Sequence, residues 1–99
     1  MAINNNSSEN VEIMSQTLRA MSHPNRIIII NLLSKCKRLS VGDISEKTGF
    51  AQPLVSHHVL DMHSKGLLSL ERDGRNAYYS LKDVRIMKIL KIASDIESA

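Results

Sequence analysis

Apolar residues recur at helical spacing near the start of the chain, behind a short polar segment. Residues 1–8 are rich in asparagine and serine, which predicts a disordered lead-in to a folded domain over residues 9–99. Residues 9–21 are predicted to form a helix, because apolar side chains fall three or four positions apart on one face. The residues of that face are Val11, Met14, Leu18 and Met21.

A second helix is predicted over residues 24–35. Ser22 can cap its free amides, and Pro24 is tolerated in a first helical turn. The four isoleucines at 27–30 would alone favour a strand, but the cap and the continuation into leucines at 32 and 33 favour a helix. Because this helix is apolar on every side, we expect neighbours on every side.

Two short helices follow a basic turn at residues 36–39. Ser40 can cap the first, which is expected to have about two turns and to end at Gly49 in a left-handed conformation. The second is expected to start at Gln52 or Pro53 and to run to residue 65, with Gly66 as its stop. Two short helices joined by a tight glycine-containing turn form a helix-turn-helix pattern.

The apolar period changes from helical to alternating after residue 66. Alternate positions share a face from 68 to 72 and again from 77 to 81, on either side of a turn at 73–75, which predicts a β-hairpin. The hairpin is expected to bury one of Tyr78 and Tyr79 and to leave the other half exposed.

The last helix is predicted over residues 82–94, with an apolar stripe wider than one small core needs. Its surplus face and that of the helix at 9–21 predict a homodimer. The expected interface residues are Val11, Met14, Leu18, Ile86, Met87, Leu90 and Ala93. The expected fold is mainly α (α+β), a winged helix-turn-helix with four helices, two strands and a final helix.

Basic charge is concentrated in the middle of the chain. The net charge is +3, but residues 16–92 carry 13 basic and 6 acidic side chains, a net +7. This balance suits a polyanionic partner, because lysine and arginine release condensed counterions from phosphates. The single cysteine, Cys36, fits a reducing cytoplasm, and no apolar run is long enough to span a membrane. We therefore expect a cytoplasmic protein.

Four motifs occur in order along nearly the whole chain. They are LRAMSHPNR at 18–26, LSVGDI at 39–44, VSHHV at 55–59 and GRNAYYSL at 74–81. Together they resemble the ArsR/SmtB family of bacterial winged-helix repressors. The resemblance implies a homodimer bound to double-stranded DNA at a partly palindromic operator, usually repressing transcription until an effector loosens the complex.

The same resemblance allows the effector sites of the family to be compared position by position. Ser40 and Gly42 stand at the positions of the Cys-x-Cys pair of arsenic, lead and cadmium sensors. The positions of the zinc, cobalt or nickel site are occupied by Asp83, Arg85, Ile96 and Ala99. Asn31 stands at the position of the first persulfide-sensing cysteine. One carboxylate does not hold a transition metal. We therefore expect no cofactor and no metal, and the effector stays unknown.

The helix at 52–65 is expected to read DNA. A recognition helix presents its first turns to base edges, where side chains that donate and accept hydrogen bonds are useful. With positions 55, 59 and 62 facing inward, Gln52 is expected to read bases, and Ser56 and His57 to contact bases or phosphates. The alternative is an ordinary solvated face. The full predicted set of DNA contacts is Gln52, Pro53, Ser56, His57, Lys37, Arg38, Lys47 and, at the hairpin tip, Arg72 and Arg75.

Two other groups of residues raise chemical hypotheses. A metal site could use His57, His58, Asp61 and His63, but one short helix cannot direct three of these at one ion, so His58 is interpreted as a half-buried structural histidine. Cys36 lies between two lysines and could sense oxidants, although a turn cysteine without a role is the favoured interpretation.

Two alternative functions stay open beside DNA-binding repression. The basic face could meet an acidic protein partner, or the chain could activate genes by competing with another DNA-bound protein. An enzyme is disfavoured, because the sequence offers no convergent acid, base and nucleophile outside the helix-turn-helix.

Overall fold

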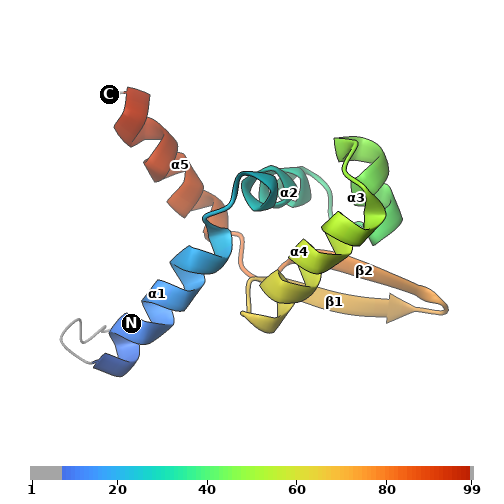
Figure 1. Cartoon of the computed structure of the whole chain (residues 1–99), viewed down its shortest axis with the longest axis horizontal. Coiled ribbons are helices and arrows are strands. Elements are labelled where there is room, and N and C mark those ends of the chain that lie inside the picture. The colour runs from blue at the N-terminus through green and yellow to red at the C-terminus, as the bar shows by residue number, and fades with distance from the viewer. Residues whose placement is uncertain (1–7, 99) are drawn as a thin grey trace.

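The computed structural model describes residues 8–98, with side chains to residue 96, and these form five helices and a β-hairpin (Figure 1). The elements are α1 (Ser8–Met21), α2 (Pro24–Lys35), α3 (Val41–Thr48), α4 (Gln52–Ser64), β1 (Leu68–Asp73), β2 (Asn76–Leu81) and α5 (Ile86–Ser98). Their order confirms the predicted winged helix-turn-helix. Of the predicted lead-in, residues 1–7 lie outside the described residues, and Ser8 already belongs to α1.

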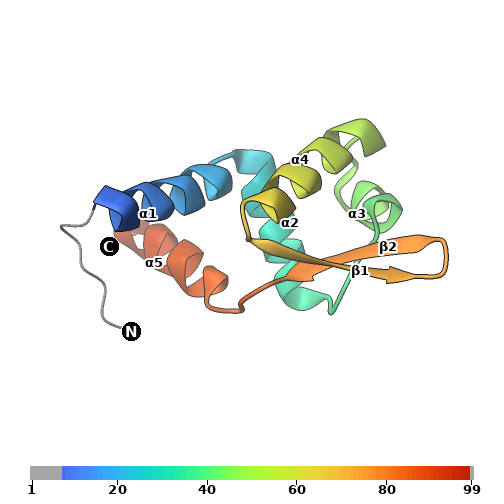
Figure 2. The same ribbon diagram turned by 90° about the horizontal axis from the view of Figure 1, so that it is seen from below.

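The core lies among α2, α3, α4 and the hairpin, while α1 and α5 extend at the opposite end of the molecule from the hairpin tip (Figures 1 and 2). The inward face predicted for α4 is confirmed. The fully buried side chains are Ile29, Ile30, Ile44, Val55, Val59, Met62 and Leu68. Within residues 8–98, no helix has the length and apolar character needed to cross a membrane.

The helix-turn-helix has the predicted start and turn. The Asp43 amide donates to Ser40 Oγ at 3.0 Å, and the Ser40 amide donates to the Asp43 carboxylate at 3.0 Å, so the two residues form a capping box. These contacts with the Ser40 backbone and hydroxyl hold the pKa of Asp43 below its ordinary value. Gly49 ends α3 with a φ of 79°, a conformation that glycine adopts without steric cost.

The two predicted faces of the hairpin lie opposite one another, although burial does not alternate strictly along either strand. Leu70 lies opposite Tyr79, and Tyr79 is buried while Tyr78 is half-buried. Leu39, in the turn before α3, adds a short bridge to β2. Its amide donates to the Tyr79 carbonyl at 2.9 Å, and the Tyr79 amide donates to the Leu39 carbonyl at 2.7 Å. The hairpin is therefore fixed to the helix-turn-helix at its middle, and its tip extends beyond.

The predicted cap and burial of α2 are wrong. His23, not Ser22, caps the helix, with Nδ1 accepting from the Asn25 amide at 3.1 Å. Nor is the helix covered on every side, because Ile27 and Ile28 are 41% and 47% exposed in a single chain. The repeated isoleucines face two environments, one in the core and one on the surface.

The last helix starts and ends four residues later than predicted. Asp83 accepts hydrogen bonds from the Arg85 amide at 2.9 Å and from the Arg85 guanidinium at 2.7 Å, which keeps residues 83–85 in a turn. The Arg85 contacts lower the pKa of Asp83 to about 2. The helix then starts at Ile86, which is buried in the core of its own chain. Ile86 therefore leaves little surface for the dimer interface predicted for it.

Candidate nucleic-acid interface

The start of α4 is exposed. Gln52, Pro53 and His57 are exposed, and Ser56 is half-buried. Ala51 precedes the helix and provides no side-chain cap, so amides of the first turn are open to an outside acceptor such as phosphate. The structure thus brings together the four residues that the sequence predicted for this helix.

The hairpin tip carries two arginines without acidic partners. Arg72 and Arg75 are exposed, and neither forms a salt bridge with any residue that the structure describes. Gly74 turns the chain between the strands with a φ of 63°. The tip extends on the side of the molecule away from α1 and α5 (Figure 2).

Arg38 is not available as a free phosphate contact. Its guanidinium donates to Glu71 at 2.9 Å and to Asp73 at 3.3 Å, and it stacks 4.1 Å from the centre of the Tyr78 ring. In this structure Arg38 braces the hairpin, and its contact with phosphate stays a prediction. By pairing with both acidic side chains of β1, it also reduces the negative charge beside the tip arginines.

The two predicted lysines differ in position. Lys47 is exposed in the last turn of α3, one element away from the start of α4. Lys37 is exposed and lines a hollow with Cys36, Leu81 and Val84, at the base of the hairpin. Lys47 thus belongs to the helix-turn-helix, whereas Lys37 lies at the base of the hairpin. Cys36 is a half-buried free thiol.

The four metal-binding candidates of α4 have different partners. Asp61 accepts from Arg26 and from Lys65, each at 2.6 Å, and these contacts hold the pKa of its carboxyl below the ordinary value. His58 is buried against Arg26, and His63 lies beside the Tyr79 ring. Within residues 8–96, no three histidine, cysteine or acidic side chains are placed to hold one metal ion.

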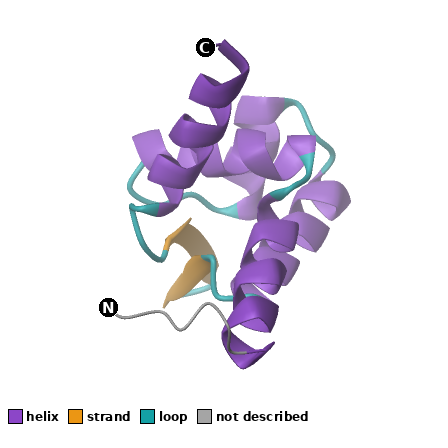
Figure 3. Ribbon diagram, turned by 90° about the vertical axis from the view of Figure 1, so that its left-hand side faces the viewer, coloured by secondary structure: helices purple, strands orange, loops and turns teal. Residues whose placement is uncertain are grey.

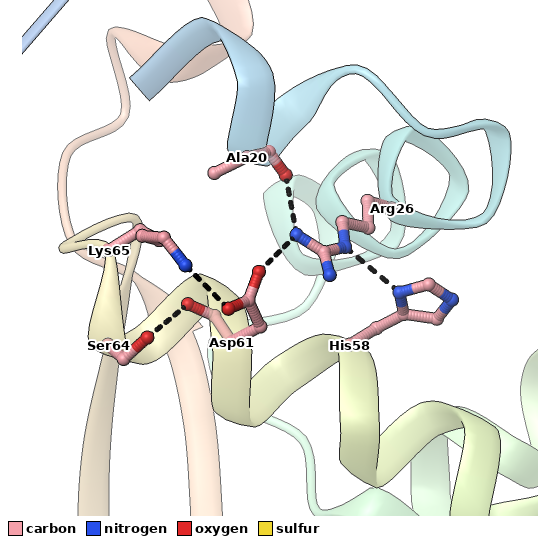
Figure 4. A network of polar contacts seen from close by, with 6 residues as sticks. All are labelled: Ala20, Arg26, His58, Asp61, Ser64 and Lys65. Atoms are coloured by element: carbon pink, nitrogen blue, oxygen red, sulfur yellow. Dashed lines mark hydrogen bonds and ion pairs between the residues drawn. The ribbon is translucent and has the colours of Figure 1, made fainter. Parts of the chain in front are cut away.

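Sequence reasoning missed the role of Arg26. Its side chain is buried and joins α2 to two other helices, α1 at the Ala20 carbonyl and α4 at His58 and Asp61 (Figure 4). Arg26 was visible only as part of the first motif, and no local pattern reveals partners that lie 32 and 35 residues away.

A second surface is formed by α1 and α5, at the end of the molecule that faces the viewer in Figure 3, and it carries exposed apolar side chains. Leu18 and Ile89 line one hollow between the helices. Met87 and Leu90 are half-buried against the core, and Ile13 belongs to this surface although the predicted face omitted it. The exposed apolar residues, called the α1–α5 strip below, are Val11, Ile13, Leu18, Ile89, Ile92 and Ile96.

Comparison with known proteins places this architecture in one family. The sequence profile of "Bacterial regulatory protein, arsR family" matches residues 23–69. Nodulation protein NolR of Rhizobium meliloti is 35% identical over 88 residues, covering 89% of this chain and 71% of NolR. Transcriptional repressor PagR of Bacillus anthracis is 34% identical over 83 residues, covering 84% of this chain and 83% of PagR.

A solved structure agrees over the whole fold. NolR from Sinorhizobium fredii superposes with a TM-score of 0.81 at 32% identity, covering 100% of this chain and 98% of that one. The fold, the exposed start of α4 and the relatives lead to one assignment. The chain belongs to the arsR family of bacterial regulatory proteins, which are DNA-binding transcriptional regulators and not enzymes.

Proposed function

We propose that the chain represses transcription as a homodimer on a partly palindromic operator. The observation that carries this proposal is the exposed start of α4, flanked by the two free arginines of the hairpin tip. Gln52 can pair with both polar atoms of an adenine edge in the major groove, and Ser56 and His57 can donate to bases or phosphates. Arg72 and Arg75 then reach the backbone or minor groove beside that site.

The α1–α5 strip supports the homodimer. Ile92 and Ile96 are 60% and 72% exposed, and side chains of this size rarely cluster on the surface of a monomer. A two-fold dimer through the strip places one copy of α4 on each side, and a palindrome with half-sites about one helical turn apart matches that symmetry. The similarity to a protein named as a repressor favours repression over activation.

Repression without the recognised metal or dithiol switches of the family is part of the proposal. Ser40, whose hydroxyl is engaged in the capping box, and Gly42 occupy the positions of the metal-sensing thiols, and neither is a zinc or arsenic ligand there. Asp83 is the one potential ligand at the α5 site, and it is bound by Arg85. DNA affinity should therefore not respond to zinc.

Selection of bound sequences from a random DNA pool tests the proposal. We expect a partly palindromic sequence, with affinity unchanged by zinc or by reductant. The variant Gln52→Ala should lose about 1–3 kcal/mol of discrimination at one base pair of each half-site, whereas Lys88→Gln, on the polar face of α5, should bind like the wild type. Binding without preference over random duplex would refute the proposal.

A further inference from the structure

The contact between Arg26 and His58 connects the recognition helix α4 to the rest of the chain. Arg26 Nε donates to His58 Nδ1 at 2.9 Å, and Arg26 Nη1 donates to Asp61 at 2.6 Å and to the Ala20 carbonyl at 3.2 Å. Figure 4 shows the guanidinium between α4 and the end of α1. One buried side chain thus joins α4 to the helix that carries the α1–α5 strip.

The geometry fixes the protonation state of His58. Arginine Nε always carries a proton, so Nδ1 of His58 must accept and the ring must be neutral, with its own proton on Nε2. Within the described residues, His58 Nε2 is buried without a hydrogen-bond partner. An unpaired buried donor is unfavourable, so a histidine at this position is not explained by stability alone.

Protonation of His58 would break this contact. A proton on Nδ1 would face the Arg26 N–H, replacing a hydrogen bond of 2.9 Å with two donors that both carry positive charge. The charged and titratable groups that act on the ring are Arg26 of α2, His23 before α2, and His57 and Asp61 of α4. Lys65 at the end of α4 pairs with Asp61, and Arg19 of α1 lines a hollow beside Arg26 and Asp61.

Most of these groups favour the neutral ring. Burial lowers the pKa of His58 below its ordinary 6.5, and Arg26, His23 and His57 lower it further, while Asp61 acts in the opposite direction. Asp61 stays ionised through the mildly acidic range, because its own pKa is lowered by Lys65 and Arg26. The contact is therefore intact at neutral pH.

We propose that Arg26 is a positioning residue that holds α4 in place for DNA binding through neutral His58, and that protonation of His58 weakens this hold and leaves the Arg26–Asp61 ion pair as the remaining polar link to α4. This inference rests on the proposed function. Two recognition helices must keep a fixed separation to enter half-sites one turn apart. Because Arg26 links α4 to the end of α1, loss of its contact with His58 loosens that separation and weakens specific binding.

The test compares specific DNA affinity of the dimer between pH 7.5 and pH 5 by fluorescence anisotropy. The wild type should lose affinity below the pKa of His58, by up to about tenfold per pH unit for each protomer. His58→Asn places an amide oxygen near Nδ1 and cannot be protonated, so its affinity should stay constant. His63→Asn, the same change at an exposed site of α4, should follow the wild type. An equal fall for His58→Asn and the wild type would overturn the proposal.

A second measurement uses the wild-type protein without DNA, so it needs no variant. Nitrogen NMR shifts of the wild-type protein report which ring nitrogen of His58 carries the proton. We expect the Nε2-protonated form at pH 7.5 and a titration midpoint below 6.5. A proton on Nδ1 at pH 7.5 would disprove the contact. If the wild type binds no specific DNA at pH 7.5, the proposed function fails, while the NMR titration still tests the contact.

Discussion

Replacing Arg75 with glutamine tests whether the hairpin tip contacts phosphates. Lys47, Arg72 and Arg75 are exposed and form no salt bridge with any described residue, so a dimer offers six such cations. Each neutralised phosphate contributes about −0.9 to the slope of the logarithm of the binding constant against the logarithm of the salt concentration, so six cations should give a slope of about −5. Arg75→Gln removes two cations per dimer, which should reduce the slope to about −3.6.

Fluorescence anisotropy with the selected operator between 50 and 200 mM salt measures both slopes. The wild type should lose about 10³ in affinity across this range and the variant about 10². Lys88→Gln removes the same charge from the polar face of α5 and should leave the slope unchanged. An Arg75→Gln slope equal to that of the wild type would show that the tip does not contact phosphate.

Three further predictions concern the brace, the strip and the last helix. Arg38→Gln should weaken DNA binding, because Glu71 and Asp73 lose their partner and leave negative charge beside the tip arginines, and adding Glu71→Gln and Asp73→Asn should restore it. Ile92→Glu should give monomers in sedimentation velocity, whereas Lys88→Glu should stay dimeric; a dimeric Ile92→Glu would contradict the proposed interface. The lowered pKa of Asp83 stabilises the fold above pH 4, and this contribution is lost as the pH falls to about 2. The thermal midpoints of Asp83→Asn and the wild type should therefore converge between pH 4 and 2, and a constant difference would refute this.

The elements were predictable because each depends on local signals. The capping box at Ser40, the left-handed Gly49 and the alternation of the hairpin involve residues a few positions apart. The start of α5 was missed because the Asp83 side chain, with its hydrogen bonds to Arg85, competes with the helix in the same few residues. Where two local signals conflict, periodicity alone does not choose between them.

The candidate interface was predictable only in part. Exposure of Gln52 and His57 followed from the inward face of α4, which apolar spacing reveals. The partners of Arg38 lie 33 and 35 residues away, on a strand whose register decides which charges meet. Such pairings depend on the tertiary fold, so the sequence predicted a basic side chain for DNA where the structure shows a brace.

The hairpin leaves an unpaired strand edge among the described residues, and charged side chains on that edge oppose aggregation. Within residues 8–98, β1 pairs only with β2, so the outer edge of β1 has backbone groups free to join a strand of another molecule. Three consecutive charged residues, Glu71, Arg72 and Asp73, occupy the outer half of that edge. Charged side chains oppose edge-to-edge pairing, so the hairpin can extend toward DNA without seeding aggregation of the regulator.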